Sequence, residues 1–92
     1  MITAIVFIEA EVSQISEIAQ QIAEISGVSE VNSVTGELDL IAMVRVRSHD
    51  EIARVVPDRI NKVPGVLSTQ TQIAYRAFSR HDLEDAFSIG LD

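Results

Sequence analysis

A short segment of this 92-residue chain carries polar groups at a spacing that could hold a small zwitterion. Asp39 offers a carboxylate for an ammonium group, and the preceding Gly36, Glu37 and Leu38 offer backbone N–H groups for a carboxylate. Glycine permits the positive φ and the close backbone approach that such a tight turn requires. The segment is therefore a candidate cradle for an α-amino acid.

A second segment contains Thr69 and Thr71, two residues apart in a run with the composition of a strand. Because side chains alternate along a strand, both hydroxyls point to the same side and can bond one ligand together. A plainer interpretation also fits, in which Gly36 makes a hairpin turn, Asp39 is an exposed turn carboxylate and the threonines are ordinary strand formers. Spacing alone leaves both interpretations open.

Other candidate sites are weaker. The run 81–85 places an imidazole beside carboxylates, but a capped, solvated acidic helix explains it better than a metal, so no metal site is predicted. His49 has no base, His or Cys near it in the sequence. No phosphate loop, nucleophile elbow or metalloprotease motif occurs, so we predict no catalytic residue and no cofactor. Four arginines could pair with acidic partners or form a solvated rim. They are Arg45, Arg47, Arg54 and Arg59.

Composition narrows the class of protein further. Lys plus Arg number 7 against 14 for Asp plus Glu, a net charge of −7 that repels phosphate and anionic lipid and argues against direct nucleic-acid or membrane binding. Cysteine is absent, and the longest apolar run, 4–8, is too short to span a bilayer and follows no basic segment. We expect a cytoplasmic protein whose core is built from Ile, Val, Leu and Ala.

Periodicity predicts two β-α-β units. Strands are expected over 2–11, 28–34, 38–47 and 66–76, a first helix over about 13–26, and a second helix after Ser48 that ends before Pro64. Ser13 is predicted to cap the first helix and Gly27 to end it, while Ser48 and Glu51 form a reciprocal cap for the second. Pro57 should kink or interrupt that second helix.

The two units correspond when the second is shifted by 38 positions, which pairs Gly27 with Gly65 and Ile22 with Ile60. Right-handed crossovers joined by a hairpin most simply give a ferredoxin-like α+β fold, with a four-stranded antiparallel sheet and both helices on one face. This domain is expected to occupy residues 1–77. A C-terminal helical tail is expected over 78–92.

The central strands are apolar on both faces. Leu40, Ala42, Val44 and Val46 alternate on one face, yet Ile41 and Met43 between them are apolar too. The second face carries Ile5, Phe7, Ile41 and Met43. Two helices cannot cover both faces, which favours a dimer formed sheet to sheet; the alternative is that the chain's own C-terminal segment folds over the second face.

Three segments together resemble the effector-binding domain of the Lrp/AsnC regulators (the leucine-responsive and asparagine-responsive family), also called the RAM domain. They are Val-Thr-Gly-Glu-Leu-Asp-Leu at 34–40, Pro-Gly-Val at 64–66 and Thr-Gln-Thr at 69–71, and the resemblance covers about residues 1–76. It implies the fold described above, dimers that pair through their sheets, and rings of eight or ten subunits. It also implies an amino-acid effector between dimers, held by the loop from Thr35 to Asp39 and by strand-four hydroxyls.

The chain also departs from the family pattern. Typical members have a helix-turn-helix domain before this one, whereas here the first strand begins at Ile2, as expected of a stand-alone effector domain. Leu38 stands where the family often has an aromatic residue, and Pro57 and the tail after residue 77 are less typical.

Together these features predict a homo-oligomeric, amino-acid-responsive regulator that is not an enzyme. It would sense its effector alone or co-assemble with a full-length Lrp/AsnC regulator and tune that protein's DNA affinity. Two alternatives remain open: a small dimeric α/β-barrel enzyme, such as an isomerase or cofactor-free oxygenase, and an oligomerisation module without a ligand. The enzyme would need an acid or base in the cavity between sheets.

Overall fold

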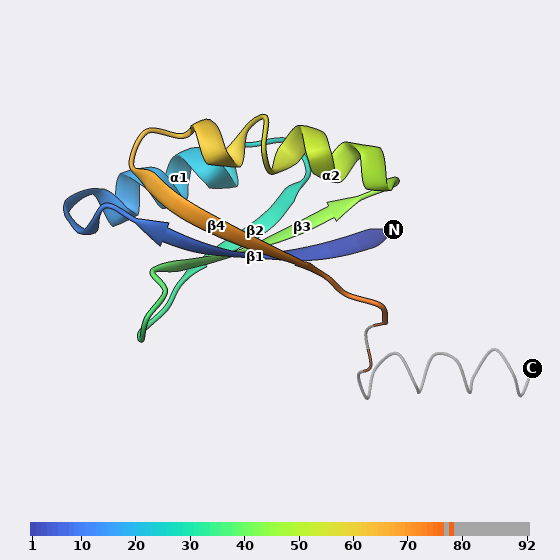
Figure 1. The fold of residues 1–92 in the computed structure, drawn as a ribbon, viewed down its shortest axis with the longest axis horizontal. Coiled ribbons are helices and arrows are strands. Elements are labelled where there is room, and N and C mark those ends of the chain that lie inside the picture. Colours follow the sequence, from blue (N-terminus) through green and yellow to red (C-terminus); the bar gives the residue numbers. More distant parts are fainter. Residues whose placement is uncertain (77, 79–92) are drawn as a thin grey trace, which may run out of the picture.

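The computed structural model describes residues 1–76 and 78, which form one antiparallel sheet with its helices packed on a single face (Figure 1). The strands lie in the order β2-β3-β1-β4, as the ferredoxin-like prediction requires. In chain order the elements are β1 (Ile2–Ala10), the 3-10 turn η1 (Val12–Gln14), α1 (Ile15–Ala23), β2 (Val28–Ser33), β3 (Leu40–Val46), α2 (His49–Val55), η2 (Ile60–Lys62) and β4 (Val66–Ile73). The predicted tail helix lies outside the described residues, apart from position 78.

The core lies between the sheet and the helices. Alternate residues of the two central strands point into it, and all of them are buried. From β1 and β3 they are Ala4, Val6, Ile8, Ala10, Leu40, Ala42, Val44 and Val46. The helical side contributes Ile18, Ile22, Ile52, Val55, Val56 and Ile60. The buried hydrophobic side chains are thus aliphatic throughout, as the composition predicted.

Both ends of α1 correct the prediction, because the helix spans Ile15–Ala23 instead of about 13–26, while the left-handed conformation expected of Gly27 is confirmed. Ser13 lies in η1 and caps nothing, because the chain enters the helix through this 3-10 turn and Gln14 takes the N-cap position without a side-chain bond. Gly27 ends the crossover with φ +99°, and its repeat partner Gly65 has φ +97°. Both are in the left-handed region, which glycine adopts without steric cost.

Two local signals shape α2. The Ser48 Oγ accepts the Glu51 N–H at 3.4 Å, as predicted, but the Glu51 carboxylate accepts the Arg47 N–H at 3.2 Å instead of that of Ser48. The helix ends at Val55, two residues before Pro57, and a separate 3-10 turn follows. The predicted interruption at the proline is confirmed, because a proline ring cannot continue the helical hydrogen bonds.

The hairpin between β2 and β3 is longer than predicted. β2 ends at Ser33 and β3 begins at Leu40, so residues 34–39 form a six-residue loop instead of a three-residue turn. Two backbone hydrogen bonds hold the ends of this loop against the sheet. The Val34 N–H donates to the Asp39 carbonyl, and the Asp39 N–H donates across to the Ile8 carbonyl of β1, both at 3.1 Å.

The face of the sheet away from the helices, here called the open face, carries an apolar centre. Ile5 lies opposite Met43 and Phe7 opposite Ile41, and all four side chains are half-buried in the single chain. Polar residues flank them on the outer strands. These are Glu30 and Asn32 on β2, and Gln70 and Gln72 on β4. The predicted two-sided apolar pattern is therefore present, with a polar border on each side.

Candidate functional site

The candidate site is built around the 34–39 loop at one end of the sheet. Thr35, Gly36 and Glu37 are exposed at its tip, whereas Leu38 and Asp39 are half-buried beneath them. Gly36 has φ +112°, and a Cβ placed there would meet no atom within 4 Å. Glycine is needed here for the backbone conformation and not for lack of space, so the backbone at the tip remains open to a ligand.

The Asp39 side chain has a structural partner that the sequence did not reveal. Its Oδ2 accepts the backbone N–H of Ala10 at 2.8 Å. Ala10 is buried and lies beyond Ile8, the last β1 residue that pairs with β3, so its N–H would otherwise lack a strand partner. One carboxylate oxygen of Asp39 is thus committed to the fold, and a ligand ammonium would have to approach Oδ1.

Thr69 and Thr71 share one side of β4, as predicted, but that side faces the helices. They lie opposite Ile8 and Val6, whose side chains are fully buried in the core. The Thr69 hydroxyl donates to the Asn61 Oδ1 at 2.6 Å, while Thr71 is exposed. The first threonine hydroxyl therefore already has a partner within the subunit.

The structure brings the loop and Thr69 to the same level of the sheet but not into contact. Ile8 binds the Asp39 N–H through its carbonyl and lies opposite Thr69 on its other side. β1 therefore separates β3 from β4, and two strand spacings amount to roughly 10 Å. Thr71 lies two residues further from the loop. Within one subunit the predicted site residues therefore lie on opposite sides of β1 and do not form one common pocket.

Sequence reasoning missed three residues at this end of the sheet. Asn61 could not be linked to Thr69 because only the fold brings η2 to β4. Val12 and Leu67 are exposed apolar side chains, at 76% and 65%, on segments joined by the Glu11 N–H to Gly65 carbonyl bond of 2.8 Å. Their signal in the sequence was weak, since single exposed aliphatic residues are common.

The structure gives no support to the other possible sites weighed from the sequence, His49 and the run 81–85. His49 is an exposed residue at the start of α2. The 81–85 run lies outside the described residues, and among those described no group of three His, Cys, Asp or Glu side chains could hold a metal ion. Within the same part of the chain, no helix is long and apolar enough to cross a membrane.

A ferredoxin-like sheet with an apolar open face and a Thr-Gly-x-x-Asp loop defines the class of this chain as a small α+β domain. The model of the Lrp/AsnC ligand binding domain matches residues 3–83. The chain belongs to this family.

Relatives of known sequence and structure agree with this assignment. An HTH-type transcriptional regulator of Pyrococcus horikoshii is 44% identical over 59 residues, which are 64% of this chain and 39% of that protein. A Thermus thermophilus protein of known structure is 41% identical, with a TM-score of 0.81 over 87% of this chain and all of its own. A feast or famine regulatory protein of M. tuberculosis, solved with L-methionine, is 26% identical, with a TM-score of 0.72 over 86% of this chain and 53% of its own. This chain spans less than half the length of the curated relatives it matches.

Proposed function

We propose that this chain is an amino-acid-sensing regulatory domain that binds its effector between subunits and modulates transcription indirectly, in the cytoplasm. The observation that carries the proposal is the open loop tip at Gly36 above an Asp39 carboxylate whose Oδ1 has no hydrogen-bond partner among the described residues. Family membership and the methionine-bound regulator of M. tuberculosis support the choice of an amino acid as the ligand class.

The chemistry of the proposed site follows from the loop. Backbone N–H groups at Gly36, Glu37 and Leu38 would receive the effector's carboxylate, and the Asp39 Oδ1 its ammonium group. Glu9 and Glu11 are exposed at the end of β1 and Glu37 is exposed on the loop. Their charges add a negative potential that attracts the ammonium group.

The separation of the loop from the threonines supports a site shared between subunits. β1 keeps Asp39 about two strand spacings from Thr69, so hydroxyls that complete the cradle are best supplied by Thr69 or Thr71 of another copy. Exposed Val12 and Leu67 at the same end provide apolar surface for that contact. A ligand bound there stabilises the assembled state, since only that state contains a complete site.

Assembly would begin at the open face. If a few hundred Å² of apolar area around Ile5, Phe7, Ile41 and Met43 is removed from water, about 25 cal/mol per Å² yields several kcal/mol per subunit. Dimers formed in this way would then join into rings such as octamers or decamers. Co-assembly with a full-length Lrp/AsnC regulator would transmit the effector signal to DNA that this acidic chain does not itself bind.

The same surface argues against the enzyme alternative. A hollow of about 350 Å³ on the open face is lined by residues that include Thr3, Ile5, Met43 and Tyr75, and neither a carboxylate nor an imidazole is among them. General acid–base chemistry between sheets needs a group that exchanges a proton near the reacting atoms, and the one phenol in this lining, that of Tyr75, is fully exposed. We therefore propose a binding function without catalysis.

The test is a thermal-shift screen against each of the twenty L-amino acids, followed by calorimetry with those that raise the melting temperature. Asp39→Asn should weaken binding at least tenfold while keeping an oxygen that accepts the Ala10 N–H. Glu24→Gln makes the same charge change at an exposed position at the end of α1, away from the cradle, and should stay within about twofold. Silence of all twenty amino acids, or equal affinity of Asp39→Asn and the native protein, would contradict the proposal.

A further inference from the structure

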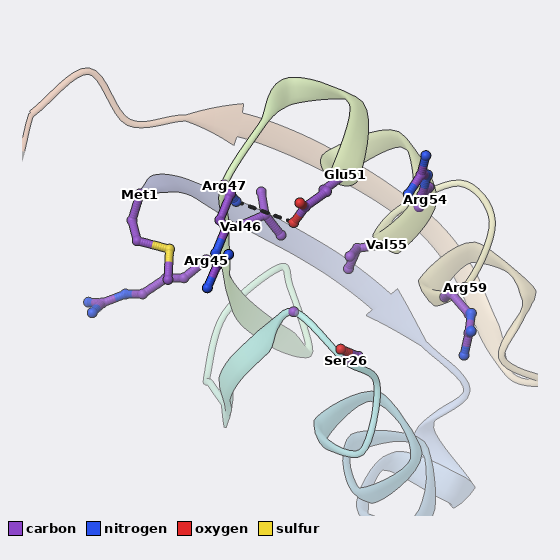
Figure 2. A pocket seen from close by; sticks show the side chains of 10 residues that line it. Met1, Ser26, Arg45, Val46, Arg47, Glu51, Arg54, Val55 and Arg59 are labelled. Atoms are coloured by element: carbon purple, nitrogen blue, oxygen red, sulfur yellow. Dashed lines mark hydrogen bonds between the residues drawn. The ribbon is translucent and has the colours of Figure 1, made fainter.

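A second hollow lies at the opposite end of the sheet from the 34–39 loop. It occupies about 490 Å³ where the end of β3 meets α2 and the turn before β2 (Figure 2). Its lining includes Arg45, Arg47, Arg54 and Arg59, and we call it the arginine pocket. β3 runs from the loop to this pocket, and its seven residues place the two sites roughly 20 Å apart.

The arginine pocket concentrates the positive charge of an acidic protein. The whole chain has 7 Lys and Arg residues against 14 Asp and Glu residues, and four of those seven cations line this one hollow. A single carboxylate, that of Glu51, lies among them. The local balance is therefore strongly positive while the protein as a whole is at −7, so this pocket attracts an anion that most of the acidic surface repels.

Glu51 does not neutralise the four guanidinium groups. Its Oε2 accepts the backbone N–H of Arg47 at 3.2 Å, an interaction that belongs to the start of α2. This is the one hydrogen bond drawn among the lining residues in Figure 2. All four arginine side chains are exposed, so their donors are hydrated and can be reached by a ligand.

The arginines come from two ordered elements and their flanks, which spreads the charge over the hollow. Arg45 and Arg47 lie two residues apart at the end of β3, where the Arg45 N–H donates to the Gly27 carbonyl at 2.8 Å. Arg54 lies in the last turn of α2, and Arg59 lies just before η2. The pair at the end of β3 and the pair beside α2 lie on different sides of the hollow. One carboxylate cannot bond to both pairs, so a ligand that does must carry more than one anionic group.

The chemistry of the lining selects a phosphate chain. Guanidinium forks bond phosphate oxygens two at a time, and a volume of several hundred Å³ suits a small molecule. No aromatic side chain is among the residues that line the hollow, so nothing there would stack on a nucleobase. We propose that the arginine pocket binds a linear polyphosphate group, whether free or as the triphosphate of a nucleotide, independently of the effector site.

Calorimetry with sodium tripolyphosphate on the full chain at about 50 mM NaCl tests this proposal. The double variant Arg54→Gln/Arg59→Gln should lose at least tenfold in affinity. The matched control Lys62→Gln/Arg76→Gln removes the same charge outside the arginine pocket and should stay within about twofold of the native protein. ATP should bind about as tightly as tripolyphosphate, whereas orthophosphate should bind at least tenfold more weakly.

Three results would overturn the proposal. The first is no heat of binding with millimolar tripolyphosphate. The second is an equal loss in both double variants, which would mean that net charge alone attracts the anion. The third is orthophosphate binding as tightly as tripolyphosphate, which would mean that the arginines do not act together. Circular dichroism of each variant confirms that a lost affinity does not reflect lost folding.

Discussion

Asp39 combines two roles in one side chain. Its Oδ2 satisfies the Ala10 N–H at the irregular end of β1, and its other oxygen is the proposed ammonium acceptor. The plain interpretation of Asp39 as an exposed turn carboxylate is wrong, because the residue is half-buried and bonded to a strand 29 positions away. Its binding role stays a prediction.

Replacing Asp39 with alanine should destabilise the fold by about 1–3 kcal/mol, because the buried Ala10 N–H would lose its acceptor. Asp39→Asn should cost less, since the amide oxygen can still accept that bond. Urea unfolding followed by circular dichroism measures both. Glu37→Ala, at an exposed position of the same loop, should stay within about 0.5 kcal/mol. If Asp39→Ala is as stable as Glu37→Ala, the bond does not contribute to folding.

The helix starts show how similar sequence signals lead to different structures. Ser13 and Ser48 both precede apolar-periodic segments, yet only Ser48 caps its helix. Ser48 has an extended backbone, with φ −144° and ψ 159°, that turns its hydroxyl toward the Glu51 N–H. Ser13 lies inside a 3-10 turn, where the backbone conformation needed for capping is absent.

This difference gives a paired prediction for the two serines. Ser48→Ala should destabilise the protein by about 0.5–2 kcal/mol, the usual cost of losing an N-cap. Ser13→Ala should change the free energy of unfolding by less than about 0.5 kcal/mol. Thermal denaturation of both variants measures the difference, and equal melting temperatures would show that the 3.4 Å bond at Ser48 adds no stability.

At the scale of the whole molecule, the sheet has distinct ends and distinct faces. One end carries the 34–39 loop among exposed glutamates, and the other carries the arginine pocket. One face is covered by the helices (Figure 1). The open face presents two apolar cross-strand pairs between polar outer strands. An arrangement of this kind favours association through the open face and leaves both ends free for ligands.

The open face yields a prediction about assembly. Phe7→Asp places a charge at the centre of that face and should convert the protein to monomers, because a buried unpaired carboxylate is costly. Analytical ultracentrifugation at micromolar concentration measures the change. Gln70→Glu adds the same charge opposite Phe7 on the polar outer strand and should leave the oligomer largely intact. A native protein that sediments as a monomer would contradict both the dimer and the shared effector site.

Periodicity and local chemistry were sufficient for the order of elements and the core, whereas the family came from the resemblance of three short segments to the Lrp/AsnC effector domain. The alternation of aliphatic residues in β1 and β3, the left-handed Gly27 and Gly65, and the break at Pro57 are set by neighbours close in the sequence, so they could be predicted from it. The Thr-Gly-x-x-Asp motif was likewise visible before its surroundings were known. Element boundaries were predicted less well, because strand ends depend on which residues find a partner.

Contacts between distant segments needed the tertiary structure. The bond from Ala10 to Asp39, the pairing of Thr69 with Asn61 and the separation of the two site segments by β1 all follow from strand order and register, which place residues far apart in the chain at hydrogen-bonding distance. The arginine pocket has the same origin. Its side chains look like scattered surface charges along the sequence, and only the packing of α2 beside the end of β3 gathers them around one hollow.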